Sequence, residues 1–487
     1  MNPQLVIIVI AAYFGVLILI SFLTSRNANS ETFFTGNRQS PWYLVAFGMI
    51  GASLSGVTFV SVPGMVAVNE FSYMQMVFGF LLGYAVIALV LMPLYYKLNL
   101  VSIYTYLEQR FGVVSYKTGA FFFLLSRTIG ASFRLFLVAG VMQLALFDAW
   151  DIPFWATVLI TISLIWIYTF QGGIKTIVWT DTLQTLFMLL SVCLGIYMIK
   201  DALNLDFDGL VTTIKDSNYS KIFFFDDWND KRHFVKQFFS GAFIAIVMTG
   251  LDQDMMQKNL TCKSLGDAQK NMFWFSGALV FANLLFLGLG ALLYIYAAKE
   301  GIELPAKADD LYPMLALNNF GTFAGVVFLL GITAAAYSSA DSALTALTTS
   351  FCVDFLDFEK REETGKKKTR MMVHVGFSLL LFCVILVFKA LNDDSVISAI
   401  YRVAGYTYGP LLGLYAFGLF TKIKVKDKLV LAVCLLSPAI SYLLDTNSAD
   451  WFGGFSFGFS ILIVNGALTF IGLLLIGKYG DTQHQTS

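Results

Sequence analysis

The chain has 487 residues, of which 57% are hydrophobic and only 13% are charged. Because soluble domains carry about a quarter charged residues, this composition is that of a protein embedded in a membrane. The formal net charge is zero, which gives no reason to expect a nucleic-acid partner. The five cysteines lie mostly inside apolar runs, so we expect neither a disulfide framework nor a metal-binding cluster of cysteines.

Thirteen apolar runs are long enough to cross a hydrocarbon core, which takes about 20 helical residues. The first has no basic segment before it and no small-residue cleavage site after it, so we interpret it as a retained helix rather than a signal peptide. No linker is long enough to divide the chain, which predicts a single membrane domain over residues 1–487. The runs lie near residues 4–24, 43–66, 70–95, 118–147, 153–171, 175–200, 234–254, 271–297, 321–355, 370–390, 395–421, 428–444 and 455–477.

The second run, between Gly51 and Gly64, crowds glycines, hydroxyl residues and a proline into the centre of one helix. Such a helix can unwind, and the freed carbonyls are tolerated at mid-membrane only where they line a cavity or bind an ion. A tight interface of small residues between helices would produce the same pattern. The run by itself leaves both interpretations open.

Charged residues inside apolar runs are costly in hydrocarbon and usually functional. Arg127 and Arg134 lie seven residues apart in the fourth run, on roughly one helix face, and Asp181 opens the sixth run. Either arginine would pair with Asp181, or with Asp341 in the ninth run, as a structural bridge. Alternatively, one of them would meet an anionic solute, since a guanidinium matches a carboxylate bidentately.

The ninth run places Ser338, Ser339 and Asp341 on neighbouring helix faces. Na⁺ is a hard cation and prefers oxygen ligands, so serine hydroxyls and carbonyls from the broken second helix would form a cage of low charge. Serines that bond back to the preceding turn would explain the hydroxyls, but not the carboxylate beside them. No Walker loop, metal-binding run or nucleophile elbow is present in the sequence, so we expect a transporter and not an enzyme.

Basic residues in the short loops predict the orientation. The segments 360–370 and 422–428 are strongly basic, whereas the loop from Asp201 to Asp230 is rich in aspartate. With thirteen spans and the N-terminus outside, all the basic loops fall on the cytoplasmic side, together with the C-terminus. This predicts a multi-pass protein of the plasma membrane, which in a bacterium is the inner membrane.

Five motifs follow one another over nearly the whole chain: Phe33–Arg38 with Ser40–Trp42, Tyr104–Gly112, Gly172–Gly173 with Val178–Gln184, Asp252–Gln253 with Gln257–Leu260, and Tyr408–Leu414. In this order and spacing they resemble the sodium:solute symporter family, whose members move sugars, amino acids, vitamins, iodide or organic acids with Na⁺. The resemblance implies an all-α, LeuT-type fold of two inverted five-helix repeats. Here the repeats would span about 43–200 and 234–421, with flanking helices near 4–24, 428–444 and 455–477.

The resemblance also implies where sodium binds. The main site would take backbone carbonyls of Gly51, Leu54 and Ala335, together with the hydroxyls of Ser338 and Ser339. This is the same oxygen cage that the broken helix and the serine pair indicate on chemical grounds.

Members that resemble sialic-acid transporters bind a second sodium ion. Its ligands here would be Asp181, Ser338, Asp341 and Ser342. Asp341 departs from the family pattern, in which a serine is more usual. Its carboxylate would strengthen the second sodium site, take a proton, or neutralise Arg127.

The solute would lie between the broken second span and the third, fourth, seventh and eleventh spans. Arg134 falls where the sialic-acid members place a carboxylate-binding arginine, whereas Arg127 is expected to be structural. The other expected contacts are Ser53, Ser55, Thr58, Tyr73, Gln75 and Phe243, with Tyr401 or Tyr408 as gating or stacking residues. Helix packing would also explain each of these aromatic residues.

Taken together, the sequence predicts a Na⁺-coupled secondary active symporter that imports a small organic solute, in particular an acidic sugar such as sialic acid or another carboxylate. The expected partners are Na⁺, the solute and the lipid bilayer, without nucleic acid or an obligate protein partner. One alternative is Na⁺- or H⁺-coupled symport of a neutral sugar or other small solute, with Asp341 or Asp181 carrying the proton. Another is a transporter-like sensor or channel.

Overall fold

The computed structural model describes residues 3–25, 38–169, 173–356, 363–391 and 396–478. Residues 33–37 of the first motif, Gly172 of the third, and the basic residues 360–361 lie outside these ranges. The described part is almost entirely helical. Two short strands within it, β1 (Lys424–Val425) and β2 (Gly477–Lys478), pair antiparallel.

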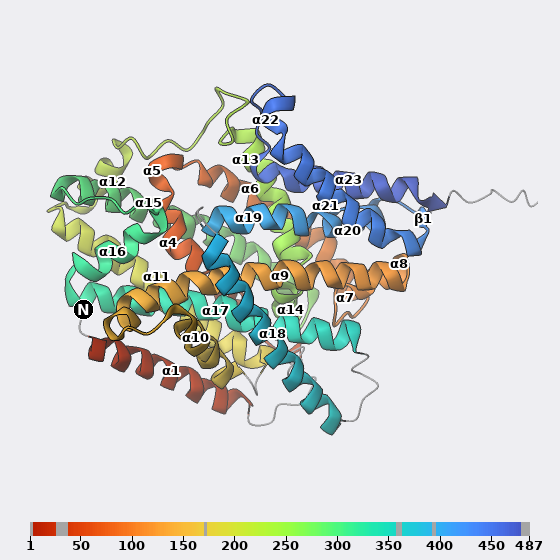
Figure 1. Cartoon of the computed structure of the whole chain (residues 1–487), viewed down its shortest axis with the longest axis horizontal. Helices are drawn as coiled ribbons and strands as arrows, with labels where there is room; N and C mark the ends of the chain where they lie inside the picture. Colours follow the sequence, from red (N-terminus) through yellow and green to blue (C-terminus); the bar gives the residue numbers. More distant parts are fainter. Residues whose placement is uncertain (1–2, 26–37, 170–172, 357–362, 392–395, 479–487) are drawn as a thin grey trace, which may run out of the picture.

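Long helices alternate with short connecting helices and turns (Figure 1). In the first half of the chain they are α1 (Pro3–Ser25), α3 (Trp42–Ser53), α4 (Gly56–Gly64), α5 (Val66–Asn69), α6 (Tyr73–Val86), η2 (Ile87–Leu91), α7 (Met92–Lys97), α8 (Thr105–Arg110), α9 (Val113–Met142), η3 (Gln143–Phe147), η4 (Asp148–Trp150), α10 (Phe154–Thr169), α11 (Gly173–Ala202) and α12 (Phe207–Lys215). In the second half they are α13 (Phe234–Ala245), η5 (Ile246–Gly250), α14 (Gln253–Asn259), α15 (Leu265–Glu300), η6 (Ala308–Asp310), α16 (Leu311–Asn318), α17 (Gly321–Phe355), α18 (Glu363–Leu391), α19 (Val396–Thr407), α20 (Gly409–Phe420), η8 (Asp427–Leu429), α21 (Val430–Thr446), α22 (Ser448–Trp451), η9 (Gly458–Ser460) and α23 (Ile461–Leu475).

Each predicted apolar run coincides with a helix or a pair of helices. Among the described residues, nine helices are long and apolar enough to cross a membrane, or up to eleven when each of two bent pairs counts as one span. Two shorter apolar helices, Phe154–Ile167 and Gly409–Phe420, belong to predicted runs but are below that length. The all-helical, multi-pass architecture is confirmed, and the count of thirteen stays a prediction.

Two of the runs are broken helices. α3 ends at Ser53 and α4 begins at Gly56, with a bend of 52° between them. A helix end leaves the carbonyls of its last turn without intrahelical donors, and here that end is buried. The second bend, of 70°, separates η5 from α14. Asp252 lies directly before α14, and its side chain accepts hydrogen bonds from the amides of Asp254 and Met255. An aspartate in this capping position favours a new helix start at that point.

α17 occupies the centre of the molecule, and every residue from Gly331 to Ser350 is buried. α9, α11 and α3 pack against it, and α1 lies outside, against α11 (Figure 1). The hydroxyls and the carboxylate of the ninth run are therefore surrounded by protein. In such an environment a polar group needs a protein partner or a bound ligand.

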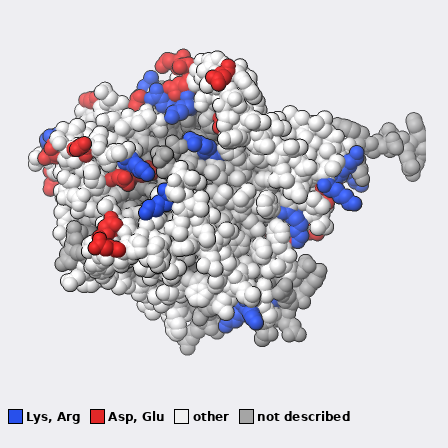
Figure 2. All heavy atoms as spheres, in the orientation of Figure 1, with Lys and Arg blue, Asp and Glu red and all other residues white. Residues whose placement is uncertain are grey.

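Charged side chains gather toward the two ends of the molecule. On the face drawn in Figure 2, a broad uncharged surface separates an end rich in Lys and Arg from an end where both signs mix. The start of α1 and the strand β1 lie at opposite ends (Figure 1). This distribution is expected for helices that cross a hydrocarbon core. Which end faces the cytoplasm stays a prediction.

Glycines allow α6 and α13 to approach each other backbone to backbone. A Cβ atom on Gly79 would collide with the carbonyl oxygen of Phe238, and one on Gly241 with the carbonyl oxygen of Met76. Small residues favour such contacts in membranes. Lipid tails are as apolar as the helix surfaces, so van der Waals packing and not the hydrophobic effect drives helices together there.

Gly79→Ala is expected to lower the free energy of unfolding by about 1–3 kcal/mol, because the added methyl group would force two packed backbones apart. Gly376→Ala on α18 is the matched control, since its Cβ would meet no described atom within 4 Å. Thermal unfolding of the two detergent-solubilised variants measures the difference. Equal melting temperatures would contradict the close contact between α6 and α13.

Candidate functional site

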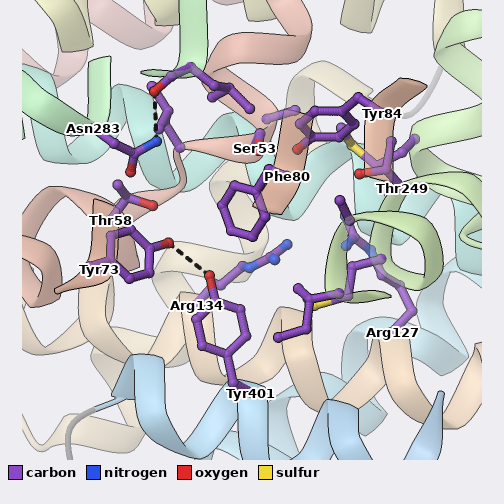
Figure 3. A pocket seen from close by; sticks show the side chains of 17 residues that line it. Ser53, Thr58, Tyr73, Phe80, Tyr84, Arg127, Arg134, Thr249, Asn283 and Tyr401 are labelled. Carbon is purple, nitrogen blue, oxygen red and sulfur yellow. Dashed lines mark hydrogen bonds between the residues drawn. The ribbon is translucent and has the colours of Figure 1, made fainter. Parts of the chain in front are cut away.

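A cavity lies beside the break between α3 and α4, where α6, α9, α13 and α15 converge (Figure 3). Its cavity volume is about 70 Å³, and the empty space is about 610 Å³ when the open solvent at its mouth is included. Hydroxyls, one amide and two guanidinium groups supply its polar surface, and the remainder is aliphatic or aromatic. The lining consists of Ala52, Ser53, Leu54, Thr58, Tyr73, Phe80, Tyr84, Arg127, Arg134, Ile244, Ala245, Met248, Thr249, Met255, Leu279, Asn283 and Tyr401.

Two tyrosines meet at one side of the cavity. The hydroxyl oxygens of Tyr73, at the start of α6, and Tyr401, on α19, lie 2.9 Å apart. Figure 3 shows this pair beside Arg134. The hydrogen bond links α6 and α19, which are distant in sequence and both contribute to the cavity lining.

Asn283, in the middle of α15, presents an unused hydrogen-bond acceptor. Its Nδ2 donates to the carbonyl oxygen of Leu279 at 2.8 Å, whereas its Oδ1 is buried and accepts no hydrogen bond from the described residues. Leaving a buried acceptor unpaired costs about 1–3 kcal/mol. Asn283 is therefore positioned to accept a hydrogen bond from a hydroxyl group of a solute.

Arg127 is neutralised by two carboxylates. Its Nη2 donates to Oδ2 of Asp254, and its Nη1 lies 3.9 Å from Oδ2 of Asp252. These ion pairs differ from the predicted ones with Asp181 or Asp341. The reason is the bend before α14, which brings Asp252 and Asp254 against α9 and has no clear signature in the sequence.

The two carboxylates connect Arg127 to two further helices. The hydroxyl of Tyr408 donates to Oδ2 of Asp252 at 2.5 Å, which ties the start of α20 to α14. The hydroxyl of Ser342 on α17 donates to Oδ2 of Asp254 at 3.2 Å. Arg127 is thus the centre of a buried polar network, and its role in the described structure is to hold helices together.

Arg134 is in a different electrostatic position, although it lies only two turns further along α9. It lines the cavity, and only 9% of its surface is exposed. No described carboxylate lies within 4.0 Å of its guanidinium, and its Nε is buried without a described acceptor. Because an uncompensated buried charge is costly, this guanidinium is available to a bound anion.

Several residues predicted to contact the solute do line the cavity: Ser53, Thr58, Tyr73 and Arg134, together with Tyr401. They come from five helices, α3, α4, α6, α9 and α19, and lie within reach of one ligand in the cavity. That they bind it stays a proposal.

Three predicted contacts lie outside the lining. Gln75 is used by the loop before α13, because its Nε2 donates to the carbonyl oxygen of Arg232 at 2.9 Å and its Oε1 accepts from the amide of Phe224 at 3.0 Å. Ser55 lies at the start of α4 and is buried, but not at the cavity surface. Phe243 lies just before the residues of α13 that do line the cavity, and successive helix residues point in different directions.

The lining residues that the sequence analysis missed are mostly apolar residues within apolar runs, which carry no distinguishing signal. Asn283 is an exception, because an amide at the centre of the run 271–297 is unusual enough to have been noticed. The missed residues are Ala52, Phe80, Tyr84, Ile244, Ala245, Met248, Thr249, Met255, Leu279 and Asn283.

Oxygen atoms of α3 and α17 converge at the break of the second run. Oγ of Ser339 lies 3.2 Å from the carbonyl oxygen of Ala52 and 3.4 Å from that of Ala335. Oxygens about 2.4 Å from one hard cation stand about 3.4 Å from each other, so this spacing fits a shared cation. Gly51 directly precedes Ala52 on α3, and Leu54 follows Ala52 by two positions as the capping residue of this helix.

Ser338 faces a different partner. Its hydroxyl donates to Oδ1 of Asp181 on α11 at 2.6 Å, and Nζ of Lys258 lies 2.7 Å from Oδ2 of the same carboxylate. Ser342 donates to the carbonyl oxygen of Ser338 at 3.0 Å, and Asp341 is fully buried between the two serines in sequence. The residues predicted for a second sodium ion are therefore neighbours, but both oxygens of Asp181 already have partners.

Comparison with known sequences adds independent information. Residues 33–428 match the model of the sodium:solute symporter family. The chain is 24% identical to the sodium/sialic acid symporter NanT of Aliivibrio fischeri, over 95% of this chain and 92% of the relative. It is 24% identical to the sodium/sialic acid symporter SiaT of Proteus mirabilis, over 85% and 84% of the two chains.

Solved structures resemble the fold. A substrate-bound, outward-open Na⁺-coupled sialic acid symporter superposes with a TM-score of 0.82 at 21% identity, covering 97% of this chain and 98% of the other. Mhp1, a nucleobase-cation-symport-1 family transporter in a closed conformation, superposes with a TM-score of 0.56 at 15% identity, covering 92% and 96%. The predicted LeuT-type fold class is thereby confirmed.

The two arginines of α9 are expected to differ in their effect on stability. Arg127→Met leaves two buried carboxylates without their counter-charge, which should cost about 3–5 kcal/mol. Arg134→Met should leave the melting temperature of the solute-free protein unchanged or raise it, since no described carboxylate pairs with Arg134. Thermal unfolding of both variants without solute makes the comparison. A loss in Arg134→Met as large as in Arg127→Met would indicate a structural counter-ion for Arg134.

Proposed function

Because the chain belongs to the sodium:solute symporter family, it couples solute transport to Na⁺, and we propose that the solute is an acidic sugar of the sialic acid type or another small carboxylate. The observation that carries this proposal is the contrast between the two arginines at the cavity. Arg127 is neutralised by carboxylates, whereas Arg134 is buried, lines the cavity and has no described ion-pair partner.

The remainder of the cavity suits a solute with one anionic end and a body that carries hydroxyl groups. A carboxylate would bind the guanidinium of Arg134 through two parallel hydrogen bonds. Ser53, Thr58 and Asn283 would bind the solute's polar groups, and the apolar residues of α13 would contact its carbon skeleton. The names of similar relatives, which are sialic acid symporters, support the same class of solute.

We propose that Na⁺ binds at the break of the second run, with Ser339, Ser338 and the carbonyls of Gly51, Leu54 and Ala335 as its ligands. The observed convergence of Ser339 with the carbonyls of α3 and α17 supports this assignment. Because Ser53 and Leu54 belong to the same segment and also line the cavity, sodium binding orders part of the solute site. Each binding event then favours the other.

The energy available is sufficient for accumulation. One Na⁺ that enters together with one carboxylate solute moves no net charge, so the Na⁺ concentration gradient and not the membrane potential drives the uptake. At about 1.4 kcal/mol per decade, a roughly tenfold Na⁺ gradient supports a roughly tenfold solute gradient. The proposed direction is import across the plasma membrane, with the N-terminus outside and the C-terminus in the cytoplasm. The end rich in Lys and Arg in Figure 2 supports this orientation. We also propose thirteen spans, the repeats at about 43–200 and 234–421, and function without an obligate protein partner.

Uptake into proteoliposomes tests the solute class. N-acetylneuraminate should accumulate when an inward Na⁺ gradient is present, and Arg134→Gln should reduce the uptake at least about 100-fold, since a charged hydrogen bond of about 3 kcal/mol is lost. The methyl ester of the same sugar, which lacks the charge, should be a poor substrate for both proteins. Equal transport of acid and ester would favour the neutral-solute alternative, and uptake driven by a pH gradient without Na⁺ would favour proton coupling.

Ser339→Ala tests the sodium site. Loss of one hydroxyl ligand should raise the Na⁺ concentration for half-maximal uptake by about tenfold, corresponding to about 1.4 kcal/mol. The affinity for the solute at saturating Na⁺ should change little. Thr348→Val is the matched control. It removes another buried hydroxyl of α17, which donates to the carbonyl oxygen of Leu344. An unchanged sodium requirement in Ser339→Ala would remove this residue from the site.

A further inference from the structure

Lys258 places a positive charge in the dry interior of the protein. Its side chain is 2% exposed, and it belongs to α14, all seven residues of which are buried. Its Nζ lies 2.7 Å from Oδ2 of Asp181, whose side chain is 1% exposed. A buried ammonium is costly unless it is paired at short range. In this chain the carboxylate of Asp181 is that partner.

Asp181 is the carboxylate that the sequence analysis assigned to a second sodium ion. In the structure Oδ2 is taken by Lys258 and Oδ1 accepts the hydrogen bond from Ser338 at 2.6 Å. The hydroxyl of Ser342, another member of the predicted set, donates to Asp254 and to the carbonyl oxygen of Ser338. A sodium ion bound by Asp181 would have to displace the ammonium group, which would then be buried without its counter-charge.

We infer that the ammonium group of Lys258 is the resident counter-ion of Asp181 and takes the place of a second sodium ion. An ammonium carries the same single charge as Na⁺, but it is tethered and is not transported. The inference rests on the proposed sodium site at the break of the second run, which needs no oxygen of Asp181. There the oxygens of Ala52, Ala335 and Ser339 converge, and Ser338 is the one proposed ligand that also donates to Asp181. The chain should therefore bind one Na⁺ in each cycle.

Equilibrium binding of ²²Na⁺ to the purified full-length protein tests this stoichiometry. The wild type should saturate at one ion per chain, with a hyperbolic isotherm. Lys258→Met keeps much of the apolar stem but removes the charge, so that Asp181 becomes available to a mobile cation. This variant should saturate at two ions, and Na⁺ should raise its melting temperature more than it raises that of the wild type, since ligand binding to the folded state stabilises it.

The matched control is the double variant Asp181→Asn, Lys258→Met, in which both charges of the pair are removed and Asp341 is unchanged. It should fold without a sodium requirement and return to one bound ion. Choline chloride at equal ionic strength replaces sodium chloride in a parallel melt, which separates specific binding from screening.

The inference is overturned if the wild type binds two sodium ions, or if folded Lys258→Met saturates at one. The wild-type measurement decides the question even if Lys258→Met does not fold. Failure of the proposed sodium coupling gives a different result, namely a wild type that binds no ²²Na⁺ and takes up solute equally in choline buffer.

Discussion

A charge that is buried in a membrane protein needs a counter-charge, and in this chain the short helix α14 supplies several of them. Asp254 and its capping residue Asp252 pair with Arg127 on α9, and Lys258 pairs with Asp181 on α11. All residues of α14 are buried, so these pairs form where water cannot replace them. The long helices around the centre are thus joined through one segment of seven residues.

The two bends provide different chemistry. At the end of α3 the chain offers backbone carbonyls and hydroxyls, which are neutral oxygen ligands suited to a monovalent hard cation. At the second bend and along α14 it offers charged side chains, which pair with Arg127 and Asp181. Arg134 is the cation at the cavity for which neither bend supplies a partner within the described residues. The proposed specificity for an anion therefore rests on this unpaired positive charge at the cavity.

The sequence was sufficient for the architecture because hydrophobicity and length are read directly from apolar runs. Composition left open whether the run near Ser53 is a broken helix or a tight interface of small residues, and the structure shows a break there. Arg134 and Tyr73 were placed at the cavity through the family resemblance. The partners of Arg127 and Asp181 were not predicted, because they depend on how α14 is oriented after its bend, and a helix direction in space has no local sequence signal.

Some expected solute contacts lie outside the cavity lining because of the helix face on which they lie. Phe243 was expected at the solute site, whereas the next two residues of α13 line the cavity. A shift of one residue rotates a side chain by roughly 100° on a helix. Gln75 lies outside the lining for another reason, since its amide is used by backbone groups of the loop before α13. A polar residue in a membrane span can serve a nearby loop as well as a ligand.

The glycine contact between α6 and α13 has a consequence for motion. Two backbones in direct contact have no side-chain layer that could slide, so α6 with Tyr73 and α13 with Ile244 should travel as one rigid body. Movement must then occur along weaker boundaries of that body, and one of them is crossed by the hydrogen bond between Tyr73 and Tyr401. A single bond of this kind contributes only about 1 kcal/mol. Thermal energy should therefore be sufficient to break the hydrogen bond between Tyr73 and Tyr401 and to let it form again. The arrangement of α6 against α13 should not change when this happens.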